Sequence, residues 1–333
     1  MEATLNVESG RTGYTLSHLD LADGTRMALY SWPLPASPRA VVQITHGLAE
    51  HAARYDRFAR ALVQAGYAVY ASDHRGHGKT ARDASELGFF TDKDGFQQLI
   101  DDQYAVNRHI ASRHPDLPRV LFGHSFGSFV SQGYLFQYSS SVDAVVLSGT
   151  TFANPVLTGI GLTTAYAERL RLGPRSTSKV LQTLSFGSYN NAFKPTRTEF
   201  DWLSRDPDEV DKYVADPLCG FDTTVQGWID LLGGLLAIRN EARQRQIPRG
   251  LPIYLLAGTL DPVGANGQGP KQLAERLQQI GLTKVTLKLY PNARHELLNE
   301  TNRDEVTEEL VSWLDTTFGA ETGTRDESVH ASI

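Results

Sequence analysis

The chain has 333 residues with a formal net charge of −6, and 41% of its residues are hydrophobic. The negative charge argues against a partner nucleic acid, and the ordinary composition argues against a disordered or fibrous protein. One cysteine, Cys219, excludes an intramolecular disulfide, and no stretch reaches the roughly 20 apolar residues of a membrane span. Since the N-terminal segment also lacks a signal-peptide pattern, we expect a cytoplasmic protein.

Short apolar runs alternate with longer amphipathic segments along most of the chain. A hairpin signal, Asp23-Gly24, separates the first two apolar runs. Strands are expected at 16–21, 27–32, 40–45, 67–72, 120–123, 142–148, 252–257 and 285–290, and helices at 55–64, 95–114, 126–138, 270–280 and 305–318. This alternation predicts an α/β fold, in which a parallel sheet carries helices on both faces.

The alternation is interrupted in the middle of the chain. Between 150 and 238 no clear strand is present, helical pieces are separated by prolines, and apolar and aromatic side chains are frequent. Such a segment is too apolar for a linker, and we interpret it as a helical cap inserted over the carboxyl edge of the sheet. The predicted organisation is a first part of the core (1–149), the cap (150–238), a second part of the core (239–318) and a polar tail (319–333). The apolar stretch 156–162 in the cap suggests transient contact with a membrane surface.

The strongest local motif is Gly123-His124-Ser125-Phe126-Gly127, which lies between a predicted strand and a predicted helix. A G-x-S-x-G turn in this context exposes its serine beside a helix N-terminus, where developing negative charge is stabilised. The alternative is a glycine-rich turn in which the serine only caps the helix. The flanking elements favour Ser125 as a nucleophile.

A serine nucleophile needs a base and an acid, which in this arrangement follow in the order Ser, Asp, His. His295 follows the last predicted strand, whereas His330 lies in the polar tail. Asp261 follows the preceding strand and would orient His295 and stabilise the imidazolium. Three competing carboxylates do not follow a clear strand: Asp222, Asp230 and Glu296. The predicted triad is therefore Ser125, His295 and Asp261.

The loop His46-Gly47-Leu48 follows the strand 40–45 and is a candidate oxyanion-hole loop. The backbone N–H groups of Leu48 and Phe126 are the expected donors to the oxyanion. We also expect His46, Gly47 and His124 to lie against the substrate.

No cofactor or metal is expected. The segment 73–78 contains two histidines and an aspartate, but no further ligand set with zinc-like spacing accompanies it. We interpret it as a structural turn held by Asp73 and Arg75. Cys219 could be a reactive thiol near the pocket, although a buried, inert cysteine is the favoured interpretation.

Several stretches resemble α/β-hydrolases of the monoacylglycerol lipase and lysophospholipase group, which includes proteins called serine aminopeptidases. They are His46-Gly47-Leu48-Ala49-Glu50-His51 followed by Arg54-Tyr55, then Asp73-His74-Arg75-Gly76-His77-Gly78, the Ser125 turn, and Asp216-Pro217-Leu218-Cys219. The resemblance implies the α/β-hydrolase fold, with a mostly parallel eight-stranded sheet and a mobile helical cap. It also implies hydrolysis of small-molecule esters with one acyl chain, such as monoacylglycerols or lysophospholipids.

Two other functions are compatible with this fold. A prolyl-type aminopeptidase or amidase would need acidic cap residues to hold the substrate amine, and the available ones look surface-like: Glu199, Asp201, Asp206 and Glu209. A non-catalytic ligand-binding protein would have no need of a complete triad and oxyanion loop, which argues against that alternative.

Overall fold

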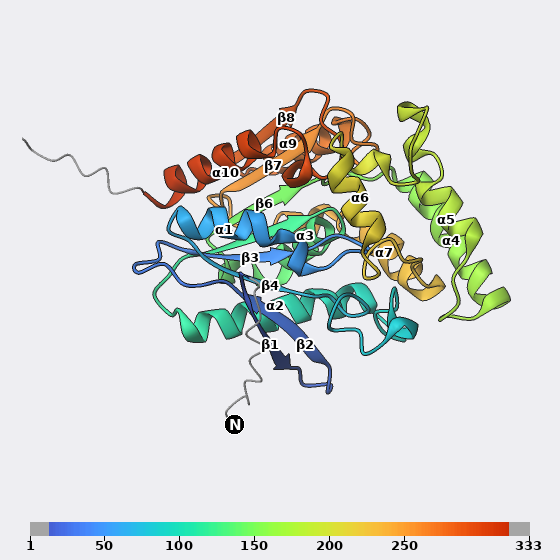
Figure 1. The fold of residues 1–333 in the computed structure, drawn as a ribbon, viewed down its shortest axis with the longest axis horizontal. Helices are drawn as coiled ribbons and strands as arrows, with labels where there is room; N and C mark the ends of the chain where they lie inside the picture. The colour runs from blue at the N-terminus through green and yellow to red at the C-terminus, as the bar shows by residue number, and fades with distance from the viewer. Residues whose placement is uncertain (1–12, 320–333) are drawn as a thin grey trace, which may run out of the picture.

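The computed structural model describes residues 13–319 (Figure 1), and within them eight strands form a single sheet. The strands are β1 (Thr15–Asp20), β2 (Arg26–Ser31), β3 (Val41–Thr45), β4 (Ala68–Ser72), β5 (Arg119–His124), β6 (Ala144–Ser148), β7 (Ile253–Gly258) and β8 (Val285–Tyr290). Their spatial order is β1-β2-β4-β3-β5-β6-β7-β8. Only the pairs β1–β2 and β2–β4 are antiparallel. The other strands are parallel, so their carboxyl ends share one edge of the sheet.

Helices cover both faces of this sheet. The helices of the core are α1 (Asp56–Gln64), α2 (Gly95–Arg113), α3 (Phe126–Tyr138), α9 (Gln268–Gln279) and α10 (Arg303–Phe318). One face packs against α1 and α10, and the other packs against α2, α3 and α9. Alternate strand residues supply the two cores: Phe122 points to the first face, whereas Leu121 points to the second. The central strands are therefore buried on both sides.

Between β6 and β7 the chain forms only helices and loops, apart from an isolated bridge between Thr177 and Thr224. The helices are α4 (Pro155–Leu172), α5 (Lys179–Phe186), α6 (Pro207–Ala215), α7 (Val225–Ala237) and α8 (Glu241–Gln244). Two short 3₁₀ helices also lie in this segment, at Tyr189–Phe193 and Asp201–Leu203. Elsewhere in the described chain, short 3₁₀ helices lie at Ala52–Tyr55, Ala84–Glu86, Ser139–Ser141 and Leu297–Asn299. The helix α4 packs on α7, and α7 packs on α2 and α3. Helices α4–α7 thus gather at one end of the molecule (Figure 1).

The predicted α/β fold, its mostly parallel eight-stranded sheet and the helices on both faces are confirmed. Differences are confined to element ends: α10 begins at Arg303, and the residues just before α1 form a 3₁₀ turn. The limits 150 and 238 of the cap remain predictions. The first ten residues, His330 and all of the predicted tail except Gly319 lie outside the described residues. Within the described part of the chain, no helix has the length and apolar character needed to cross a bilayer.

Candidate active site

Loops at the carboxyl edge of the sheet bring the predicted catalytic residues to one place. Ser125 follows β5, Asp261 follows β7 and His295 follows β8, while the His46-Gly47-Leu48 loop follows β3. In open parallel sheets this edge is where ligands bind. Residues far apart in the sequence therefore converge because their strands run in the same direction.

The turn at Ser125 holds the serine in a conformation that side-chain-bearing residues rarely adopt, with φ 49° and ψ −119°. Its backbone N–H donates to the Ser148 carbonyl at 2.9 Å, which ties the turn to β6. A Cβ on Gly123 would lie 2.5 Å from Ser131 Oγ, and a Cβ on Gly127 would lie 2.1 Å from the Thr45 carbonyl oxygen. Both glycines are therefore required by close packing, and the strained serine is the kind of outlier that marks functional sites.

His295 and Asp261 form a buried pair, with 3.0 Å between His295 Nδ1 and Asp261 Oδ1. The side chains are 2% and 0% exposed. Neighbouring loops hold the pair: Leu260 N–H donates to the Ala293 carbonyl at 3.0 Å, and Val263 N–H donates to Asp261 Oδ1 at 2.9 Å. The imidazole is thus oriented through Nδ1, which leaves Nε2 for another partner.

The electrostatic surroundings suit a histidine that is to gain a proton. Burial opposes the charged form of His295, but the Asp261 carboxylate and its hydrogen bond raise the histidine pKa above its ordinary value. Burial and the neighbouring His295 lower the pKa of His124 to about 4, so His124 is neutral at physiological pH. The pKa values of the two adjacent histidines are therefore shifted in opposite directions, and His295 is the one that can take a proton.

The loop after β3 presents backbone donors beside the serine turn. Gly47 N–H donates to Glu50 Oε1 at 2.5 Å, and Ala49, with φ 54°, donates to His77 Nε2 at 3.2 Å. Among the described residues, neither the backbone N–H of Leu48 nor that of Phe126 has a protein acceptor. Both residues line the cavity described below. Two backbone N–H groups without a protein acceptor thus belong to residues of the cavity lining, and their role as oxyanion donors stays a prediction.

His46 does not lie where the sequence prediction placed it. It is 0% exposed and is not among the cavity-lining residues. Its Nε2 accepts from the His74 backbone N–H at 2.9 Å, while Nδ1 lies 2.7 Å from the Gly47 carbonyl oxygen. The expected contact with substrate is therefore wrong for His46, whose ring supports the loop from below. Gly47 and His124 do line the cavity.

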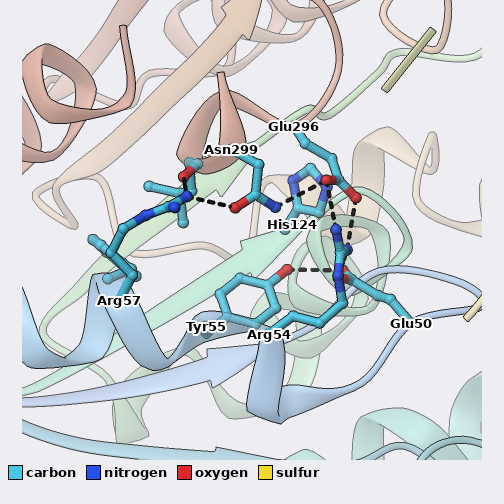
Figure 2. Close-up of a pocket in the computed structure, with 9 residues that line it drawn as sticks. Glu50, Arg54, Tyr55, Arg57, His124, Glu296 and Asn299 are labelled. Atoms are coloured by element: carbon cyan, nitrogen blue, oxygen red, sulfur yellow. Dashed lines mark hydrogen bonds and ion pairs between the residues drawn. The ribbon is translucent and has the colours of Figure 1, made fainter. Parts of the chain in front are cut away.

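A buried ionic cluster lies beneath the loop, and sequence reasoning did not reveal it (Figure 2). The Arg54 guanidinium donates to Glu50 Oε2 at 2.5 Å and to both oxygens of Glu296 at 2.7 and 2.8 Å. Glu50 also accepts from the Tyr55 hydroxyl at 2.8 Å. Burial alone would raise the pKa of Glu296, but Arg54 holds it well below the usual range. The cluster joins the oxyanion-hole loop to the residue that follows His295.

A cavity of about 990 Å³ opens above these residues, and Ser125 and His295 line its floor. Its walls come from α3, α4, α5 and α7 and are rich in apolar side chains, including Phe129, Leu157, Leu181, Leu231 and Leu235. From the segment before α6, the Trp202 ring lies 5.1 Å from the His295 ring. The cap therefore encloses the candidate catalytic residues in a largely apolar space.

Two further sequence interpretations can be compared with the structure. Asp73 accepts from the Ala52 N–H and the Tyr30 hydroxyl, and Arg75 pairs with Asp102, so the 73–78 segment is a structural turn as interpreted. The acidic cap residues are not all at the surface. Asp201 is buried and accepts from the Thr198 hydroxyl, and Glu209 is buried and accepts from the Lys212 ammonium group. Of the four residues, only Glu199 lines the cavity.

Comparison with known proteins gives consistent matches over most of the chain. A family profile described as serine aminopeptidase, S33, matches residues 36–302. A monoacylglycerol lipase of Mycolicibacterium smegmatis is 30% identical over 87% of this chain and 93% of its own. A monoglyceride lipase of Mus musculus is 30% identical over 90% of each chain. These matches confirm the resemblance noted in the sequence.

Solved structures agree. A highly thermostable carboxyl esterase from Bacillus coagulans, in complex with glycerol, superimposes with a TM-score of 0.83 and 29% identity. The match covers 92% of this chain and 99% of that one, so cap and core are both included. The α/β-hydrolase fold predicted from the sequence is thereby confirmed.

Proposed function

Because the chain belongs to the serine aminopeptidase S33 family of α/β-hydrolases, we propose that it is a serine carboxylester hydrolase acting on esters with one acyl chain. The observation that carries the proposal is the buried Asp261–His295 pair beside the strained Ser125 turn, on the floor of an apolar cavity. Monoacylglycerols, lysophospholipids and similar esters are the proposed substrate class. The lipase relatives and the esterase structure support this class.

In the proposed mechanism Ser125 Oγ attacks the ester carbonyl while His295 Nε2 takes the hydroxyl proton. Asp261 stabilises the imidazolium through Nδ1–H. The negative charge that develops on the carbonyl oxygen is met by the backbone N–H groups of Leu48 and Phe126. His295 then gives its proton to the leaving alcohol, which leaves an acyl group on Ser125. Water activated by His295 releases the acid and restores the serine.

The walls of the cavity suit an alkyl chain. Helices α4, α5 and α7 supply apolar side chains, and each CH₂ group buried there contributes roughly 0.8 kcal/mol. Neither Glu50 nor Glu296 is free to hold a substrate amine, because Arg54 pairs with both. Glu199 is the remaining acidic residue of the lining, so the apolar walls are what favours an acyl chain over the charged N-terminus of a peptide.

Contact of the cap with a lipid surface is a second part of the proposal. The start of α4 exposes Val156, Leu157 and Ile160 to solvent by 68%, 67% and 59% of their surface, and Leu184 on α5 is 62% exposed. Leu157, Ile160 and Leu184 also line the cavity. An apolar rim around a cavity mouth can meet lipid and accept an acyl ester from it. Reduced co-sedimentation of Leu157→Asp with phospholipid vesicles is expected, and unchanged co-sedimentation would refute this contact.

The direct test of the proposed function is turnover of a p-nitrophenyl ester series from acetate to palmitate, together with a monoacylglycerol. We expect hydrolysis with a distinct chain-length preference, and loss of roughly 10⁶ in kcat for Ser125→Ala. Ser128→Ala is a matched control, because Ser128 is buried one turn away on α3 and its hydroxyl only donates to the Ser125 carbonyl.

A prolyl anilide assayed in parallel separates ester from amide chemistry. Cleavage of the anilide faster than every ester would replace the proposal with aminopeptidase activity. Equal inertness of wild type and Ser125→Ala towards all of these substrates would contradict both.

A further inference from the structure

A group of metal-ligand side chains lies beside the cavity, outside the catalytic residues. His51 follows the oxyanion-hole loop, and Asp216 and Cys219 lie in the loop after α6. One ligand atom from each residue lies within 4.8 Å of the others, and His51 Nε2 is 2.9 Å from Asp216 Oδ2. None of the three lines the cavity. The group is therefore distinct from the proposed active site, although it adjoins it.

The backbone holds these ligands in place. Leu218 N–H donates to Asp216 Oδ1 at 2.9 Å, and Cys219 N–H donates to the Asp216 carbonyl at 3.0 Å. Gly220 N–H donates to the Ala49 carbonyl at 2.9 Å, which joins the cap loop to the oxyanion-hole loop. Tetrahedral zinc bonds place ligand atoms roughly 3.3–3.7 Å apart. The ligand atoms of this set, which lie within 4.8 Å of one another, are close to that spacing.

Charged side chains surround Cys219. Three carboxylates act on the thiol, from Asp216, Glu50 and Glu296, against one guanidinium, that of Arg54. Figure 2 draws the side chains of Glu50, Glu296 and Arg54 together. Burial is the largest cause of the raised pKa of the Cys219 thiol, and among the charges Arg54 acts on it most strongly, in the opposite direction. Arg54 pairs with Glu50 and Glu296, so Asp216 is the carboxylate that would act directly on a divalent cation bound to the sulfur.

We propose that His51, Asp216 and Cys219 form a binding site for a thiophilic divalent cation of the zinc type. Nitrogen, carboxylate oxygen and sulfur are the donors that zinc accepts, and three protein ligands leave a fourth position for water. On binding, the Cys219 thiol releases its proton to solvent and the neutral His51 carries its proton on Nδ1. The bound ion links the cap loop to the segment that follows the oxyanion-hole loop.

Cobalt(II) provides a direct test, because thiolate–cobalt charge transfer absorbs in the ultraviolet. Since Cys219 is the chain's one cysteine, such a band can arise from no other residue. The full chain titrated with Co²⁺ is expected to show the band with one ion bound, and Zn²⁺ is expected to displace it. The apparent affinity should fall as pH falls, because the thiol must lose its proton.

Variants separate a three-residue site from binding by the thiol alone. Cys219→Ser should abolish the band, and Asp216→Asn and His51→Gln should each weaken binding at least about tenfold. His109→Gln, on α2 and outside the group, should leave the titration unchanged. Circular dichroism of each variant identifies any that fail to fold, and the remaining variants decide the result. Absence of the band in folded wild type, or an affinity unchanged in both Asp216→Asn and His51→Gln, would overturn the proposal.

Discussion

The carboxyl edge of the sheet and the helical cap form opposite sides of one cavity, and they are built differently. At the sheet edge Asp261 and His295 are almost fully buried, and Ser125 is fixed in a strained turn by close packing of Gly123 and Gly127. Backbone hydrogen bonds and buried ionic contacts determine positions there. The cap instead contributes helices whose apolar side chains partly face solvent, as at the start of α4.

This difference indicates a division of labour. Reaction chemistry depends on the positions of a few atoms, and a rigid sheet edge can maintain them. Recognition of an alkyl chain depends on apolar area and shape, and helices with apolar side chains can supply both. Changes at the sheet edge should therefore affect rate, whereas changes in the cap should affect which ester is preferred.

After replacement of Ser125 itself, the largest effect is expected for Asp261→Asn, which keeps the shape of the side chain but removes its charge. The amide cannot stabilise the His295 imidazolium or hold the same tautomer, so kcat should fall by about 10⁴. Steady-state kinetics on a short p-nitrophenyl ester measures this. A loss of less than tenfold would mean that Asp261 is not the orienting acid.

Removal of the buried Arg54 guanidinium should have the next largest effect. Arg54→Met leaves Glu50 and Glu296 without their common partner and should destabilise the protein by about 3–5 kcal/mol. Arg57→Met is the matched control. Its side chain is 44% exposed and pairs with Glu209, so its loss should cost less than about 1 kcal/mol. Urea denaturation of both variants tests the comparison, and equal losses would contradict a special role for the Arg54 cluster.

The dependence of activity on pH follows from the raised pKa of His295. The base must be neutral to act, and its folded-state pKa lies above the ordinary value of 6.5. The acid limb of kcat/KM is therefore expected to have its midpoint above pH 6.5, with activity falling tenfold per pH unit below it. A midpoint below 6.5 would show that the Asp261 carboxylate does not outweigh burial.

The smallest effect is expected from the cap. Leu231→Ala on α7 shortens a side chain of the apolar wall and so enlarges the cavity, which should shift preference towards longer esters. Each additional buried CH₂ changes the ratio of kcat/KM between neighbouring chain lengths by roughly 0.8 kcal/mol, or about fourfold. Thermal denaturation controls for loss of fold. A uniform change for every chain length would argue against a contact between Leu231 and the acyl chain.

The sequence was sufficient to predict much of the sheet edge, for local reasons. Alternating strands and helices predict the parallel sheet, and a G-x-S-x-G turn between a strand and a helix predicts an exposed serine at the helix N-terminus. The order of the predicted strands then identifies Asp261 and His295 as candidates. Each of these signals is contained within a few consecutive residues or in the order of elements along the chain.

The remaining features depend on contacts between distant segments. Arg54 and Glu296 are 242 positions apart, and His51 and Asp216 are 165 apart, so no local spacing reveals either pairing. The error at His46 has a related cause. The residue lies next to the oxyanion-hole donors in sequence, but its ring turns towards His74 in the neighbouring loop. The direction of a side chain at the end of a strand is set by such packing.

Covalent labelling by a fluorophosphonate tests the central claim most directly, because the reagent reacts with a serine that a neighbouring base has activated. We predict one adduct per chain, located by peptide mapping at Ser125, absent in Ser125→Ala and strongly slowed in Asp261→Asn. An adduct at another serine, or none in folded wild type, would contradict the assignment of Ser125, His295 and Asp261 as the catalytic triad.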